Sequence, residues 1–120
     1  MEIPPSGWVS LTFYAGFLAL SNIFVLVMMN QAARGSRNHF AGIRLPSLMA
    51  SDSAWRAGHQ AAKKPMKPLL IFSVVLALAC IPLQLFPVLY FIFLGLSVAC
   101  TLVATLLGAV VASRAARRVR

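Results

Sequence analysis

The sequence has few charged residues, and acidic side chains are almost absent. Only 11% of its 120 residues are charged, and two acidic residues stand against eleven Lys and Arg, for a formal net charge of +9. Soluble domains usually carry about 25% charged and about 45–50% apolar residues. Here 60% of the residues are apolar. This composition excludes a water-soluble enzyme.

Charge is missing altogether from three long stretches, at residues 8–30, 69–86 and 88–112. A helix of about 20 residues crosses a hydrocarbon core that is about 30 Å thick. The sequence therefore predicts an all-α integral membrane protein with one membrane domain over residues 1–120 and three transmembrane helices at these positions. A long loop, 31–68, connects the first two helices, and a basic tail, 113–120, follows the third.

All basic residues lie in two segments, with seven in the 31–68 loop and four in the 113–120 tail. Lys and Arg in short flanking segments stay on the cytoplasmic side of a membrane. We therefore expect a protein of the bacterial inner membrane with its N-terminus outside and its C-terminus in the cytoplasm. The positive charge is expected to attract anionic headgroups of the bilayer. Nucleic acid is not expected as a partner, because the basic residues flank the spans and do not alternate with aromatic residues on one face.

Side chains suited to catalysis or metal binding are also scarce. In the predicted topology Glu2 and Asp52 lie on opposite sides of the membrane, so they cannot form a catalytic pair within one chain. His39 and His59 are cytoplasmic, whereas the only two cysteines lie inside predicted spans. The spacing of His39, Asp52 and His59 matches no standard set of metal ligands. We predict no enzymatic activity, no metal and no other cofactor.

The few polar side chains inside the predicted spans are expected to face other helices. An Asn in the membrane must find a hydrogen-bond partner, and we interpret Asn22 as a helix-packing residue in preference to a ligand contact. The third span repeats small residues every four positions beside Ser and Thr at the same interval, which favours close approach of another helix. These two rows contain Ser97, Thr101 and Thr105, and Cys100, Ala104, Gly108 and Ala112. The approaching helix is either another span of the same chain or a second copy in a homo-oligomer.

The second half of the 31–68 loop has the pattern of a short cytoplasmic amphipathic helix. Ser51 or Asp52 suits the start of this helix, and Pro65 is expected to stop it. One side of the helix is a stripe of Trp55, Gly58, His59 and Ala62, and the other side carries Arg56, Gln60, Lys63 and Lys67. Such a helix lies in the membrane interface, or its stripe packs under the cytoplasmic ends of the three spans.

The first half of the loop predicts a turn followed by an extended strip. Gly42 allows backbone angles that other residues avoid, and Pro46 favours an extended conformation for Leu45. Arg44 lies between them and prefers planar anionic partners such as carboxylate or phosphate. A lipid phosphate, a helix C-terminus and a specific ligand all remain open as its partner. His59 is expected to form a hydrogen bond with the 38–44 strip.

In this order, these residues resemble the SdpI family of bacterial membrane proteins. The pattern is an Asn, then Gly-Ile-Arg-x-Pro, then Ser-x-x-x-Trp-x-x-x-His, located between one span and a pair of closely spaced spans. It is filled here by Asn38, Gly42, Ile43, Arg44, Pro46, Ser51, Trp55 and His59. The resemblance implies the three-span unit of that family. The namesake of the family is longer, protects a spore-forming bacterium against its own secreted toxic peptide and retains a repressor at the membrane.

Two functions from different classes agree with these features. The first is a non-enzymatic resistance module that captures or excludes a membrane-active peptide and signals to a protein partner through the loop between Gly42 and His59. The second is an accessory or structural subunit of a larger bacterial membrane complex. In either case Arg44, Trp55 and His59 are expected to be the working residues of the loop, and Gly42 and Pro46 are expected to hold its shape.

Overall fold

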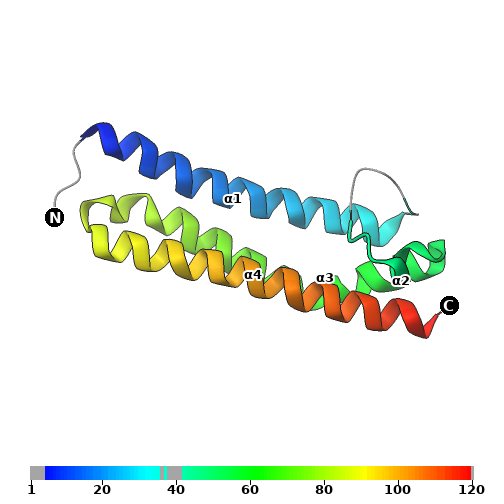
Figure 1. The fold of residues 1–120 in the computed structure, drawn as a ribbon. Coiled ribbons are helices and arrows are strands. Elements are labelled where there is room, and N and C mark those ends of the chain that lie inside the picture. The colour runs from blue at the N-terminus through cyan, green and yellow to red at the C-terminus, as the bar shows by residue number, and fades with distance from the viewer. Residues whose placement is uncertain (1–4, 36, 38–41, 120) are drawn as a thin grey trace.

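A computed structural model describes residues 5–35, 37 and 42–119, and within these ranges the chain is helical with short connections and no strand. Figure 1 shows three long helices that run along one axis, in a molecule of 56 × 21 × 18 Å. The elements are α1 (Pro5–Arg34), α2 (Pro46–Met49), α3 (Asp52–Cys80), the 3-10 helix η1 (Pro82–Leu85) and α4 (Pro87–Arg118). The all-α fold class is confirmed for the described residues.

Two of the long helices have the length and the apolar composition of membrane spans, namely Gly7–Arg34 and Pro87–Arg118. Their outward-facing side chains are large and apolar, as at Phe17 of α1 and Leu106 of α4, which are 64% and 69% exposed. Lipid tails are the solvent that suits such a surface. In α3 the apolar part begins only at Leu69, after three lysines. Its role as a third span therefore stays a prediction.

The predicted short amphipathic helix is the first half of α3. It begins where the sequence indicated, because Ser51 is the N-cap and its Oγ accepts a 3.0 Å hydrogen bond from the Ala54 amide. The prediction that Pro65 stops this helix was wrong, since α3 continues through Pro65 and Pro68 to Cys80. A proline inside a helix removes one backbone hydrogen bond. Packing of α3 against both α1 and α4 offsets this loss.

The other boundaries also differ from those expected. The second predicted span, 69–86, ends as a helix at Cys80, and η1 then turns the chain so that α4 starts at Pro87. The third span, 88–112, belongs to a longer helix that takes in most of the basic tail. The 31–68 loop is mostly helical, because α1 continues to Arg34 and α2 and the start of α3 lie within it.

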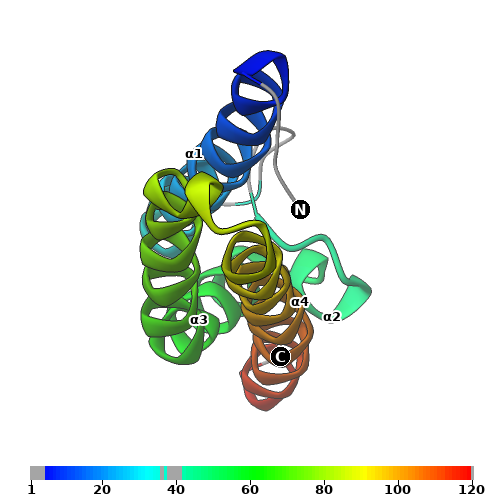
Figure 2. The same ribbon diagram turned by 90° about the vertical axis from the view of Figure 1, so that its left-hand side faces the viewer.

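Helix α3 is the centre of the bundle. It packs along α4 and along α1, whereas α1 and α4 have few contacts with each other. Figure 2, which looks along the bundle, shows α1 and α4 on separate flanks of α3. As a result, α1 and α4 are held together mainly through α3.

A buried polar cluster links the three long helices near their middle. The Asn22 side-chain amide of α1 donates to Ser73 Oγ of α3 at 2.9 Å, and Thr101 of α4 donates to Asn22 Oδ1 at 3.2 Å. Ser97 Oγ donates to the Ser73 carbonyl oxygen at 2.8 Å. Asn22 is only 1% exposed, so these bonds satisfy a polar group where water is absent. Asn22 therefore faces two other helices of its own chain, and its partner Ser73 was not predicted from the sequence.

The row of small residues on α4 lies against α3. Ala104, Gly108 and Ala112 are all buried. A Cβ added at Gly108 would overlap the sulfur of Met66 on α3. One added at Gly58 of α3 would be 3.0 Å from the Ala112 carbonyl oxygen. The sequence left open whether this row faces another span of the same chain or a second copy. The structure shows that a helix of the same chain, α3, covers it.

Both basic segments come together at one end of the bundle. This basic end consists of the C-terminal parts of α1 and α4, of α2 and of the start of α3, as Figure 1 shows. At the opposite end, the Tyr90 hydroxyl donates a 2.6 Å hydrogen bond to the Leu11 carbonyl oxygen and ties α4 to α1. A single basic end is what the predicted topology requires, and the side of the membrane that it faces stays a prediction.

Candidate functional site: the basic-end loop and the cleft beside it

A tilted, closely packed aromatic pair organises the basic end. Trp55 and His59 lie one turn apart on α3, their ring centroids are 4.2 Å apart, and neither side chain is exposed. Gly42 lies directly on this pair with a φ of 107°, in the region that favours glycine. A Cβ at position 42 would be 2.5 Å from His59 Nε2 and 2.7 Å from the Trp55 ring. Only glycine fits here, both for its backbone angle and for lack of space.

His59 uses both ring nitrogens, Nε2 to bind the loop and Nδ1 to bind its own helix α3. The Ile43 amide donates a 2.7 Å hydrogen bond to Nε2, and Nδ1 is 2.7 Å from the Trp55 carbonyl oxygen. Since Nε2 accepts, the proton of the neutral ring belongs on Nδ1. The expected bond between His59 and the 38–44 strip is confirmed. Burial lowers the pKa of His59 below its ordinary value of 6.5, although the bond to Trp55 opposes this in part.

We expect the protein to lose stability as the pH falls below about 6.5, the ordinary pKa of histidine. The folded state disfavours a charged His59, so the unfolded state binds the proton at higher pH than the folded state does. Protonation therefore stabilises the unfolded state relative to the folded state as the pH falls. Thermal unfolding in mild detergent between about pH 5 and 8, followed by circular dichroism, measures this loss. The slope should disappear in His59→Gln.

The control for this pH dependence is Asp52→Asn. The Arg37 side chain, by its hydrogen bond, lowers the pKa of Asp52 below its ordinary 3.8. The contribution of this carboxylate is therefore complete above about pH 4 and is lost only in stronger acid. Asp52→Asn should keep the slope below pH 6.5, and an identical slope in wild type and His59→Gln would contradict the assignment to His59.

The short helix α2 fastens the loop to α4. Ser47 Oγ lies 3.0 Å from Ser113 Oγ of α4, and Leu48 is fully buried in the core beside Gly58. Leu45 is extended, with φ −72° and ψ 148°, as the following proline predicted. Pro46 itself is exposed and begins α2. The loop is therefore held from two sides, by α3 through His59 and by α4 through Ser47.

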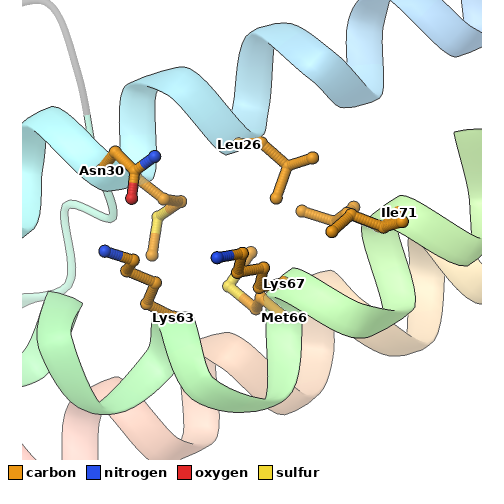
Figure 3. A pocket seen from close by; sticks show the side chains of 8 residues that line it. Leu26, Asn30, Lys63, Met66, Lys67 and Ile71 are labelled. Atoms are coloured by element: carbon orange, nitrogen blue, oxygen red, sulfur yellow. The ribbon is translucent and has the colours of Figure 1, made fainter.

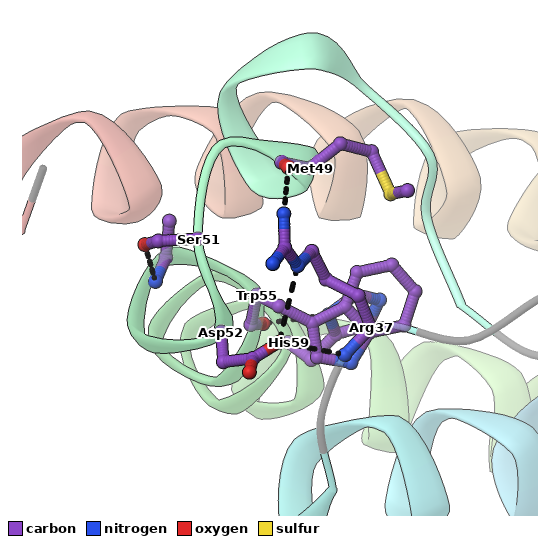
Figure 4. A network of polar contacts seen from close by, with 7 residues as sticks. Arg37, Met49, Ser51, Asp52, Trp55 and His59 are labelled. Carbon is purple, nitrogen blue, oxygen red and sulfur yellow. Dashed lines mark hydrogen bonds and ion pairs between the residues drawn. The ribbon is translucent and has the colours of Figure 1, made fainter.

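The ionic contact in this region belongs to Arg37 and was not anticipated. Its Nε donates to Asp52 Oδ1 at 3.1 Å, and its Nη1 donates to the Met49 carbonyl oxygen at 2.8 Å, as Figure 4 shows. Both side chains are nearly half exposed, so the pair adds little stability and mainly orients the turn between α2 and α3. Arg44, which the sequence indicated as the working arginine, is exposed at the surface.

The structure thus brings together Gly42, Ile43, Trp55 and His59 of the predicted motif. Ser51 has a local role as a helix cap, and Asn38 lies outside the described residues, as does His39. Two polar residues of these contacts, Arg37 and Ser73, were not predicted from the sequence. Arg37 lies in the same loop as Asp52, the only acidic residue of that loop. Ser73 is a polar residue in an apolar stretch, which is the signal that identified Asn22.

A cleft of about 340 Å³ opens between α1 and α4 next to the loop. Its wall on α1 includes Phe24 and Met28, and its wall on α4 includes Thr105 and Ala109. Gly42 and Ile43 close it at the basic end, and Met66 of α3 also lines it. The contributions of α1 and α4 come from stretches without charge. The loop that His59 holds is therefore one wall of an apolar cleft.

The described residues of this region offer few polar groups. Across the described ranges, no group of three or more His, Cys, Asp or Glu side chains is placed to hold a metal ion. The Trp55 indole N–H is buried and has no hydrogen-bond partner among the described residues. The cleft is lined by apolar side chains, with the hydroxyl of Thr105 as an exception. Such a surface suits an apolar ligand that arrives through the lipid.

The fold and the site define an all-helical protein with two membrane-type helices and a loop that is locked onto a buried Trp–His pair. A family model for the SdpI/YfhL protein family matches residues 35–113, and the chain belongs to this family. The match includes the whole loop motif as well as α3 and most of α4, and it leaves α1 outside. No curated protein and no solved structure matches the chain.

Proposed function

We propose that the protein is a non-enzymatic membrane protein of the SdpI immunity type, which binds an apolar, membrane-active peptide in the cleft between α1 and α4. The observation that supports this is the position of the loop. Gly42 and Ile43 line the cleft, and the Ile43 amide is bonded to His59. A peptide in the cleft therefore contacts the family motif directly.

The cleft suits the apolar face of a peptide. Its volume of about 340 Å³ falls in the range of small-ligand pockets, about 300–1,000 Å³, which is enough for a few side chains of a longer peptide. Three methionines, Met28, Met29 and Met66, line it, and their flexible thioethers adapt to apolar partners of different shape. The cleft has walls on both α1 and α4, and these two helices have few contacts with each other.

In this proposal the exposed Arg44 reports to a protein partner that a peptide has bound in the cleft. It follows Ile43 directly and its side chain is exposed at the basic end, where an acidic surface of a protein partner can reach it. Occupation of the cleft would shift Ile43, and the shift would change how Arg44 is presented. In this proposal the basic end faces the cytoplasm of a bacterium and the protein lies in its inner membrane.

Survival of a sensitive bacterial host tests this function. Cells that express the protein are challenged with the secreted toxic peptide against which the namesake of the family protects. Ala109→Phe fills the cleft from α4, so we expect it to abolish protection, whereas Leu106→Phe, one turn away on the exposed face, should protect like wild type. Equal protection by both variants, at equal amounts in the membrane, would rule out the cleft as the binding site.

The accessory-subunit alternative loses one of its motivations, because α3 already covers the row of small residues on α4. It still predicts a companion protein in stoichiometric amount after gentle detergent extraction. Mass spectrometry of the extracted protein therefore separates it from the peptide-binding function, which needs no such companion in unchallenged cells.

A further inference from the structure

A second crevice, of about 170 Å³, lies between α1 and α3. Figure 3 shows Asn30 and the amino groups of Lys63 and Lys67 toward one end of it, with Leu26 and Ile71 toward the other. The crevice is therefore amphipathic: two cations and an amide stand beside an apolar groove. The peptide-binding proposal makes no use of these lysines.

The two ammonium groups have no anionic partner within the described part of the chain. Among the described residues the only acidic side chain is that of Asp52, which is paired with Arg37. Lys63 and Lys67 are also one helical turn apart, and like charges at this spacing destabilise a helix. An anion between them would relieve this repulsion, so the crevice suits a negatively charged group from outside the chain.

The crevice lies at the level where both helices leave the apolar zone. The apolar stretch of α1 ends at Asn30, four residues before Arg34, and that of α3 begins at Leu69, two residues after Lys67. Side chains at this level meet the phosphate groups of the bilayer, and lysines near the surface attract anionic lipids. Leu26 and Ile71 lie on the apolar side of it, where acyl chains run.

We infer that this crevice is a binding site for one anionic glycerophospholipid. Its phosphate is held by Lys63 and Lys67 and accepts a hydrogen bond from the Asn30 amide, and one acyl chain lies along Leu26 and Ile71. The apolar groove favours a lipid over free phosphate, because free phosphate leaves the groove empty. The crevice shares Met29 and Met66 with the cleft, but the two lysines and Asn30, which bind the phosphate in this proposal, do not line the cleft.

Native mass spectrometry of the full chain in mild detergent tests this site, with phosphatidylglycerol and phosphatidylcholine as probes. We expect one molecule of phosphatidylglycerol to bind wild type at low concentration. Lys63→Gln with Lys67→Gln should weaken its binding about thirtyfold. The matched control, Arg56→Gln with Arg118→Gln, removes the same charge from exposed positions that do not line the crevice, and it should bind like wild type.

Two further arms separate the possible sources of binding. Ile71→Trp fills the apolar groove without changing any charge, so it should weaken phosphatidylglycerol binding, and glycerol phosphate should not compete. Binding that falls equally in both charge pairs would show a diffuse basic surface and overturn the proposal. So would an Ile71→Trp variant that binds like wild type, glycerol phosphate that competes as well as the lipid, or phosphatidylcholine that binds as tightly as phosphatidylglycerol.

Discussion

Replacement of Gly42 by Ala is expected to lower the free energy of unfolding by about 2–5 kcal/mol, because two costs add. The first is the backbone, whose φ of 107° is unfavourable for any residue with a Cβ. The second is overlap, since the new methyl group would be 2.5 Å from His59 Nε2 and 2.7 Å from the ring of Trp55. Relief of this overlap requires Ile43 to move away from His59.

Chemical or thermal unfolding in mild detergent measures this effect, and Gly95→Ala is the matched control. Gly95 lies inside α4, and a Cβ added there has no atom within 4 Å. The control should therefore be as stable as wild type or slightly more stable, since Ala is the better helix former. If Gly42→Ala unfolds at the same temperature as Gly95→Ala, the loop does not pack on the Trp–His pair as described.

Truncation of Trp55 to Ala should cost about 3–5 kcal/mol, the usual loss for a large aromatic side chain in a core. Trp55 is 0% exposed and supports the loop, His59 and the core of the basic end together. In contrast, Trp8 is 42% exposed near the start of α1, so Trp8→Ala should change stability little.

Trp55→Phe separates packing from hydrogen bonding at this position. The indole N–H has no partner among the described residues, so its removal leaves no group unpaired and should cost much less than Trp55→Ala. The same unfolding experiment shows the difference. A Trp55→Phe variant as unstable as Trp55→Ala would mean that the indole N–H makes a bond that stabilises the fold.

The parts of this fold that follow from local physics could be predicted from the sequence. Stretches without charge marked the apolar parts of α1 and α4, and Ser51 was identified as a possible helix cap because its side chain acts on its own first turn. The bond between His59 and the loop was also expected, since a buried imidazole needs a partner. These features depend on one segment or on a general requirement of burial.

The features that were missed depend on contacts between distant segments. The passage of α3 through Pro65 and Pro68 rests on packing against two neighbouring helices, which outweighs the local tendency of proline to end a helix. The pairing of Asp52 with Arg37 was not predicted, because it depends on the path of the chain before α3. The cleft exists because α1 packs mainly on α3 and has few contacts with α4. No periodicity in the sequence indicates which helices pair.

The most direct test of the central claim is photo-crosslinking of the toxic peptide to the protein in membranes. A photoreactive amino acid is placed at Ala109, which lines the cleft, or at Leu106, which is 69% exposed on the same helix and does not line it. The account predicts an adduct with the peptide from position 109 and only background from position 106. Equal crosslinking from both positions, or crosslinking from position 106 alone, would contradict it.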